Sequence, residues 1–150
     1  MSLAKNILVG TDFSDAARGA LEHAVALARP LGAKVTLAHA YELPIIGLPD
    51  AGFPMAAELS ARVIDAAQEE IDRLAAAHAS SGVELTTCLQ QGDPRDAILA
   101  VAKATGADLI VVGTHGRRGV ARLLIGSVAE GIVRRSTVPV LVVPPAGRPA

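Results

Sequence analysis

The chain has 150 residues, of which 51% are hydrophobic and only 2% aromatic, and its formal net charge at pH 7 is −1. This length suits one ordinary domain, whose core must be built from aliphatic side chains. Charges of both signs are interspersed, so no field of one sign is available to hold nucleic acid or an anionic membrane. No run approaches the roughly 18 consecutive apolar residues of a membrane span, and the N-terminus lacks a signal-peptide pattern, so we expect a cytoplasmic protein.

In the first half of the chain, two strand patterns are each followed by a helical one. The expected elements are a strand at 6–10, a helix ending at Leu31, a strand at 35–40, a loop at 41–54 and a helix at 55–79. Either Asp12 or Ser14 is suited to cap the first helix, and Gly32 to end it. Proline and glycine are frequent in the loop, which argues against a regular element there.

The second half continues the same alternation. The expected elements are a strand at 84–89, a helix from Asp93 to about Thr105, a strand at 108–112, a helix at 127–135, a strand at 138–143 and a flexible tail at 144–150. Asp93 followed by Pro94 is a strong helix start, because it combines a capping carboxylate with a proline at the first helical position. Gly106 is expected to end that helix.

The alternation of strands and helices, without a linker or an internal repeat, predicts a single α/β domain. Right-handed crossovers between successive strands make such a sheet parallel, with helices on both of its faces. Ligands of doubly wound sheets bind beyond the carboxyl ends of the strands, where the chain reverses direction.

A glycine- and arginine-rich segment follows the strand expected at 108–112. Gly113 and Gly116 come first, three arginines follow, and Gly126-Ser127 opens the next helical pattern. Glycine lets the backbone approach a ligand closely, and the N–H groups of a helix's first turn attract phosphate. The same residues would also make an ordinary strand-to-helix turn with Ser127 as the N-cap. Spacing by itself leaves both interpretations open.

The pattern Gly113-x-x-Gly116, nine residues, then Gly126-Ser127 resembles the signature of the nucleotide-binding universal stress proteins. Further residues similar to that family occur in order along nearly the whole chain: GTDFS at 10–14, His39-Ala40, GDP at 92–94 and VPVLVV at 138–143. The resemblance implies one universal stress protein domain over 1–150. It also implies a doubly wound, five-stranded parallel sheet of order 3-2-1-4-5, with layering like that of the adenine-nucleotide alpha-hydrolases and flavodoxins. In that order the chain reverses direction between the first and fourth strands.

The resemblance further implies an ATP site, with Mg²⁺ held through the triphosphate and not by protein ligands. Asp12, next to Thr11, would accept hydrogen bonds from the ribose or the base, while Ala40 and Val112 would wall the adenine. The residues implied at the phosphates are Gly113, His115, Gly116, Gly126, Ser127 and the backbone of Val128. Asp12 would serve equally as a helix cap, with Asp15 three residues on. Ala129 departs from the threonine found in related ATP binders, so one hydroxyl contact would be missing.

The sequence offers no nucleophile–base pair and no cluster of metal ligands, and we assign no catalytic residue. A P-loop and a dinucleotide fingerprint are both absent. We therefore expect an ATP-binding stress-response module without strong catalytic activity. The alternatives are a slow ATPase or phosphate-transferring enzyme, and a stress protein dimer that works without nucleotide.

The last expected strand, 138–143, predicts an assembly. It is apolar on both faces, yet the order 3-2-1-4-5 leaves it at an edge of the sheet, where an unpaired strand is an aggregation liability. Pairing with the same strand of a second copy would close both edges around one twofold axis, as the resemblance also suggests. We therefore expect a homodimer through this strand.

Overall fold

The structure is a computed structural model that describes residues 4–43, 52–114 and 125–145. Its strands are β1 (Asn6–Gly10), β2 (Lys34–Tyr41), β3 (Leu85–Gln91), β4 (Leu109–Gly113) and β5 (Val140–Val143). Its helices are α1 (Asp15–Leu31), α2 (Gly52–Ala76), α3 (Pro94–Thr105) and α4 (Ser127–Arg135). All strand pairs are parallel, and their order is β3-β2-β1-β4-β5. This confirms the predicted doubly wound sheet.

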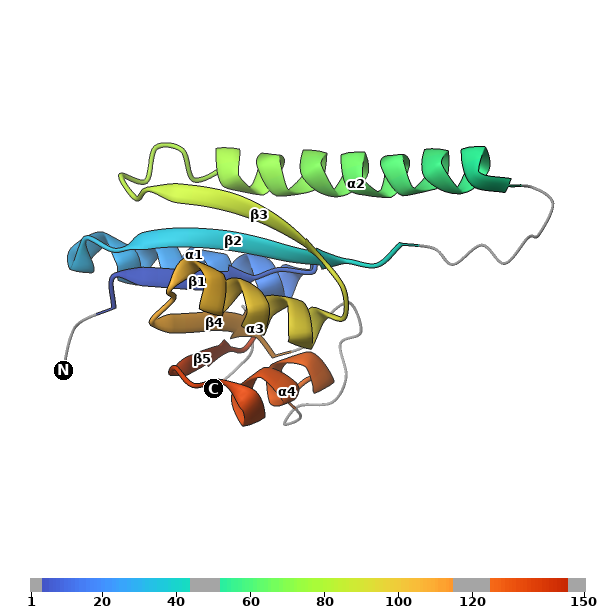
Figure 1. Cartoon of the computed structure of the whole chain (residues 1–150). Coiled ribbons are helices and arrows are strands. Elements are labelled where there is room, and N and C mark those ends of the chain that lie inside the picture. Colours follow the sequence, from blue (N-terminus) through green and yellow to red (C-terminus); the bar gives the residue numbers. More distant parts are fainter. Residues whose placement is uncertain (1–3, 44–51, 115–124, 146–150) are drawn as a thin grey trace.

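Helices cover both faces of the sheet: α1 and α2 lie on one face, and α3 and α4 on the other (Figure 1). The central strand β1 divides its side chains between them, as the two-residue repeat of a strand requires. Ile7 and Val9 pack with α1 and α2, while Leu8 packs with α3 and α4, and all three are at most 1% exposed. Burial on both faces explains why β1 is continuously apolar from Ile7 to Val9.

The predicted helix ends at α1 and α3 are confirmed. Ser14 Oγ accepts a hydrogen bond from Ala17 N (3.2 Å), and Asp93 Oδ1 accepts one from Arg95 N (2.9 Å). Each helix ends at a glycine in the left-handed region, with φ of 62° at Gly32 and 65° at Gly106. Local chemistry therefore determines where both helices begin and end.

Several predicted boundaries are wrong, most clearly those of α2 and the start of β5. α2 begins at Gly52 and ends at Ala76, so three residues of the expected loop are helical, and β5 begins at Val140. Pro54 is compatible with the start of α2, because the first-turn N–H groups of a helix have no acceptor within it. Pro139 lacks an N–H group and enters the sheet only as an acceptor, from Ile110 N at 3.0 Å. Over the three described ranges, no helix is both long enough and apolar enough to cross a membrane.

Candidate functional site

A cavity of about 520 Å³ opens at the carboxyl ends of the strands, between β1 and β4. We call it the switch-point cavity, because the chain reverses direction there. The β1–β4 pairing ends at Val9 and Val111, so the two strands are no longer paired beyond that point. The sequence-predicted residues that line it are Thr11, Asp12, Ala40, Val112, Gly113, Gly126, Ser127 and Val128. His115 and Gly116, also predicted, lie outside the described residues.

Side-chain hydrogen bonds fix the loop between β1 and α1. Phe13 N donates to Thr11 Oγ1 (3.1 Å), and Ser14 N donates to Asp12 Oδ1 (3.0 Å). Phe13 has a positive φ of 65°, the one non-glycine residue among those described that does so. Such a conformation costs about 1–3 kcal/mol and persists where its surroundings hold it in place. The exposed carboxylate of Asp12 is thereby fixed at the cavity through Oδ1, while α1 itself is capped by Ser14.

At the end of β2, the backbone of Ala40 faces the cavity. In a parallel ladder, the N–H and C=O of alternate residues point to the same side. Thr11 N donates to Ala38 O (2.9 Å), so Ala38 and Ala40 both direct their polar groups toward β1. β1 has ended by then, and no described backbone group pairs with Ala40 on that side. A donor and an acceptor therefore lie side by side at the cavity wall.

Gly113, at the end of β4, is required by packing. A Cβ built there would lie 2.9 Å from the carbonyl carbon and oxygen of Ala16 in α1. Real Cβ atoms essentially never come so close to backbone, so the first turn of α1 and the end of β4 touch only because residue 113 has no side chain. The sequence predicted Gly113 as a ligand contact, but its packing against Ala16 is a second reason why this residue must be glycine.

The first turn of α4 lines the opposite wall. Gly126 is the N-cap, and its N–H donates to Thr114 O, which ties the start of α4 to the end of β4. Ser127 is thus the first helical residue, so the alternative in which it caps the helix is wrong. The first intrahelical bond runs from Glu130 N to Gly126 O (2.9 Å), leaving the amides of residues 127–129 without acceptors within α4.

Thr114 adds an unpaired polar atom at this wall. Its Oγ1 is buried and has no hydrogen-bond partner within the described part of the chain. Buried hydroxyls are normally paired, so this one is an exception that the described contacts do not explain. Asp12 is the only charged side chain among the described lining residues. Those residues contain no group of three or more histidine, cysteine or acidic side chains that would hold a metal ion.

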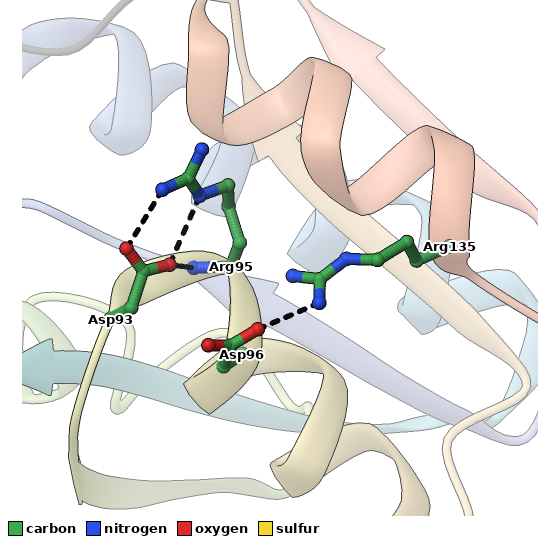
Figure 2. Close-up of polar contacts among 4 residues, drawn as sticks. All are labelled: Asp93, Arg95, Asp96 and Arg135. Atoms are coloured by element: carbon green, nitrogen blue, oxygen red, sulfur yellow. Dashed lines mark hydrogen bonds and ion pairs between the residues drawn. The ribbon is translucent and has the colours of Figure 1, made fainter.

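Near Pro94, which lines the cavity, one ion pair lies within the start of α3 and a second joins α3 to α4 (Figure 2). Arg95 contacts both carboxylate oxygens of Asp93 through Nε (3.0 Å) and Nη2 (2.9 Å), and Arg135 Nη1 lies 2.7 Å from Asp96 Oδ1. The hydrogen bonds from Arg95 hold the pKa of the Asp93 carboxyl well below its usual range. Exposed ion pairs of this kind contribute little to the stability of the fold.

Comparison with known proteins identifies the family. The model of the universal stress protein family matches residues 4–144. The chain belongs to this family. A universal stress protein of Methanocaldococcus jannaschii is 35% identical over 144 residues, which span 95% of this chain and 83% of that protein. UspA of Lactobacillus plantarum is 29% identical, with a TM-score of 0.82 over 95% of this chain and 99% of its own.

One further universal stress protein is relevant because it was solved in complex with cAMP. It is 28% identical to this chain, with a TM-score of 0.66, and the match covers 97% of this chain and 100% of that one. Nucleotide binding therefore occurs among the structural relatives of this universal stress protein.

Sequence reasoning missed several walls of the cavity in this universal stress protein. Pro94, Ile98 and Ile132 line it, and Thr114 brings its unpaired hydroxyl. Pro94 and Ile98 are four residues apart on α3, a spacing that places them on one helical face. That spacing was visible in the sequence, but the direction of the face depends on how α3 packs.

Proposed function

We propose that this universal stress protein binds ATP with Mg²⁺ in the switch-point cavity. The observation that carries the proposal is that the backbone N–H and C=O of Ala40 are unpaired in a cavity that the apolar side chain of Val112 also lines. Adenine presents an acceptor, N1, next to a donor, its N6 amino group. An N–H and a C=O held side by side complement that edge, and small apolar side chains suit the faces of the ring.

The ribose and the phosphates fit the neighbouring walls. Asp12 has an exposed carboxylate that is already oriented by Ser14 N, so a ribose hydroxyl would donate to it without reordering the side chain. The free amides at the start of α4 and the helix dipole favour phosphate. Mg²⁺ carried by the triphosphate would neutralise charge that the described lining residues do not. His115 and Gly116 remain predicted phosphate contacts.

We propose binding, and not strong catalysis, as the activity. Among the described lining residues, His39 is the only conventional base besides the carboxylate of Asp12, and its Nδ1 lies 2.8 Å from Thr11 O. No nucleophile is paired with either group there, so any hydrolysis is expected to be slow. We also propose a regulatory role in the cytoplasm, in which bound ATP changes the surface or the assembly of the protein. This part of the proposal rests on family membership.

Base selectivity tests the proposal directly. Guanine presents a donor at N1 and an acceptor at O6, which would oppose the N–H and C=O of Ala40 in the same pose. We expect ATP to bind at least roughly tenfold more tightly than GTP, the effect of about 1.4 kcal/mol. Calorimetric titration with each nucleotide in the presence of Mg²⁺ measures this ratio. Equal affinities for ATP and GTP would contradict base recognition by Ala40. If neither nucleotide binds, the nucleotide-independent alternative is favoured.

We also propose that the protein is a homodimer through β5. This four-residue strand lies at the edge of the sheet, and Leu141 is 38% exposed on it, while Val140 and Val142 pack toward α3 and α4. Leu141→Lys is therefore expected to give monomers, because a charge there would oppose edge-to-edge pairing. The core should be undisturbed, because the side chain of Leu141 is already exposed. Sedimentation velocity measures the assembly.

A matched variant controls for the added charge. Leu59 is 36% exposed, almost the same as Leu141, and belongs to α2, a helix that packs on β2 and β3 at the other end of the sheet from β5 (Figure 1). Leu59→Lys should sediment as the parent does. A monomeric parent, or a Leu141→Lys protein that remains dimeric, would remove β5 as the interface.

A further inference from the structure

His39 lies at the point where the pairing of β1 with β2 stops. The rung at Thr11 N–Ala38 O is the last one made (2.9 Å). The ladder of hydrogen bonds begins where Lys34 N donates to Lys5 O (2.8 Å), and each equivalent bond lies two residues further along both strands. The next bond after the last one made would therefore run from Ala40 N to Thr11 O. A further one would run from Phe13 N to Ala40 O. Neither bond is present between these described residues.

Both groups that Ala40 would have paired with are occupied by side chains. The carbonyl of Thr11 accepts a hydrogen bond from His39 Nδ1 at 2.8 Å. A carbonyl oxygen has no proton to give, so Nδ1 is the protonated nitrogen. The amide of Phe13 donates to Thr11 Oγ1 at 3.1 Å. The ladder therefore stops because side chains have replaced Ala40 at both of its partners.

Packing holds the imidazole in this position. The ring of Phe13 lies against it, with the centroids 4.2 Å apart and the planes inclined by 35°. Phe13 reaches this place from a left-handed backbone conformation (φ 65°). The contact thus links the unusual backbone of the β1–α1 loop to the hydrogen bond at Thr11 O.

We propose that His39 is a positioning residue for the base subsite: its imidazole takes the Thr11 carbonyl in place of the Ala40 amide and so keeps the peptide edge of Ala40 open to a ligand. In this role His39 acts through the backbone of Ala40 and needs no contact of its own with the adenine. It acts by preventing the sheet from closing one rung further over the cavity. The role in ligand binding rests on the proposed ATP site, but the competition for Thr11 O is independent of any ligand.

Amide hydrogen exchange in the unliganded parent protein tests the competition. The Ala40 amide should exchange rapidly, whereas the Thr11 amide, bonded to Ala38 O, should be protected. His39→Leu fills the same space without a donor, so Ala40 N should pair with Thr11 O and its exchange should slow. His39→Asn keeps an N–H donor where Nδ1 was and should exchange as the parent does. A protected Ala40 amide in the parent, which needs no variant to observe, would overturn the proposal.

Calorimetry with ATP and with inorganic triphosphate tests the consequence. In His39→Leu, we expect ATP to bind roughly tenfold more weakly, as loss of one or two neutral hydrogen bonds predicts, while triphosphate affinity is unchanged. His39→Asn should restore ATP affinity. If His39→Leu binds ATP like the parent, His39 does not position the site and the proposal fails. If the parent binds no nucleotide, the proposed function fails instead, and the exchange data alone decide whether His39 governs the ladder.

Discussion

Gly126→Val is expected to abolish detectable ATP binding while leaving the fold intact. Gly126 is the N-cap of α4, and its neighbours Ser127 and Val128 line the cavity. A valine side chain there would keep the phosphate oxygens from the first-turn amides. The backbone angles of Gly126, φ −59° and ψ 156°, are open to any residue, so the substitution adds no backbone strain.

Two variants calibrate the measurement. Ser127→Ala removes one hydroxyl at the same wall and should weaken ATP by about ten- to a hundredfold, the effect of one hydrogen bond to a charged group. Val133→Ala lies on the same helix with a 46% exposed side chain that does not line the cavity, and should bind as the parent does. Thermal unfolding confirms that each variant is folded. If Gly126→Val binds ATP with the affinity of the parent, the first turn of α4 does not hold the phosphates.

The features that sequence could predict are those set by short-range chemistry. Asp93 with Pro94 starts α3, and Gly32 ends α1, because caps depend on a few neighbouring residues. The strand order came from the family resemblance, since strand–helix alternation alone permits more than one doubly wound order. The start of α2 was missed because a proline in the first turn costs a helix little.

The site was predictable as a set of residues but not as a mechanism. The eight described residues predicted from sequence do line one cavity. That the Ala40 edge is unpaired depends on His39 reaching Thr11, a contact between residues 28 apart in the chain. No local pattern encodes such a contact, and in the sequence His39 stands out only as part of the family-like pair His39-Ala40. Its hydrogen bond to Thr11 O is visible only in the fold.

The packing of Gly113 against Ala16 is another contact between distant residues that the sequence does not reveal. Gly113→Ala is expected to destabilise the protein by about 1–3 kcal/mol, because the added Cβ would lie 2.9 Å from the Ala16 backbone and push α1 away from β4. Gly19→Ala is the matched control: nothing lies within 4 Å of a Cβ there, and alanine in the interior of α1 should stabilise by roughly 0.5–1 kcal/mol.

Denaturant unfolding and ATP calorimetry on both variants separate the two explanations for Gly113. A steric requirement predicts that Gly113→Ala loses stability whether or not ATP is present, since the contact with Ala16 belongs to the fold. A purely ligand-related requirement predicts parental stability with lost binding. Because Ala17 of the same helical turn lines the cavity, a displaced α1 should also weaken ATP, so reduced affinity alone does not discriminate. Stability equal to that of the parent would contradict the packing explanation.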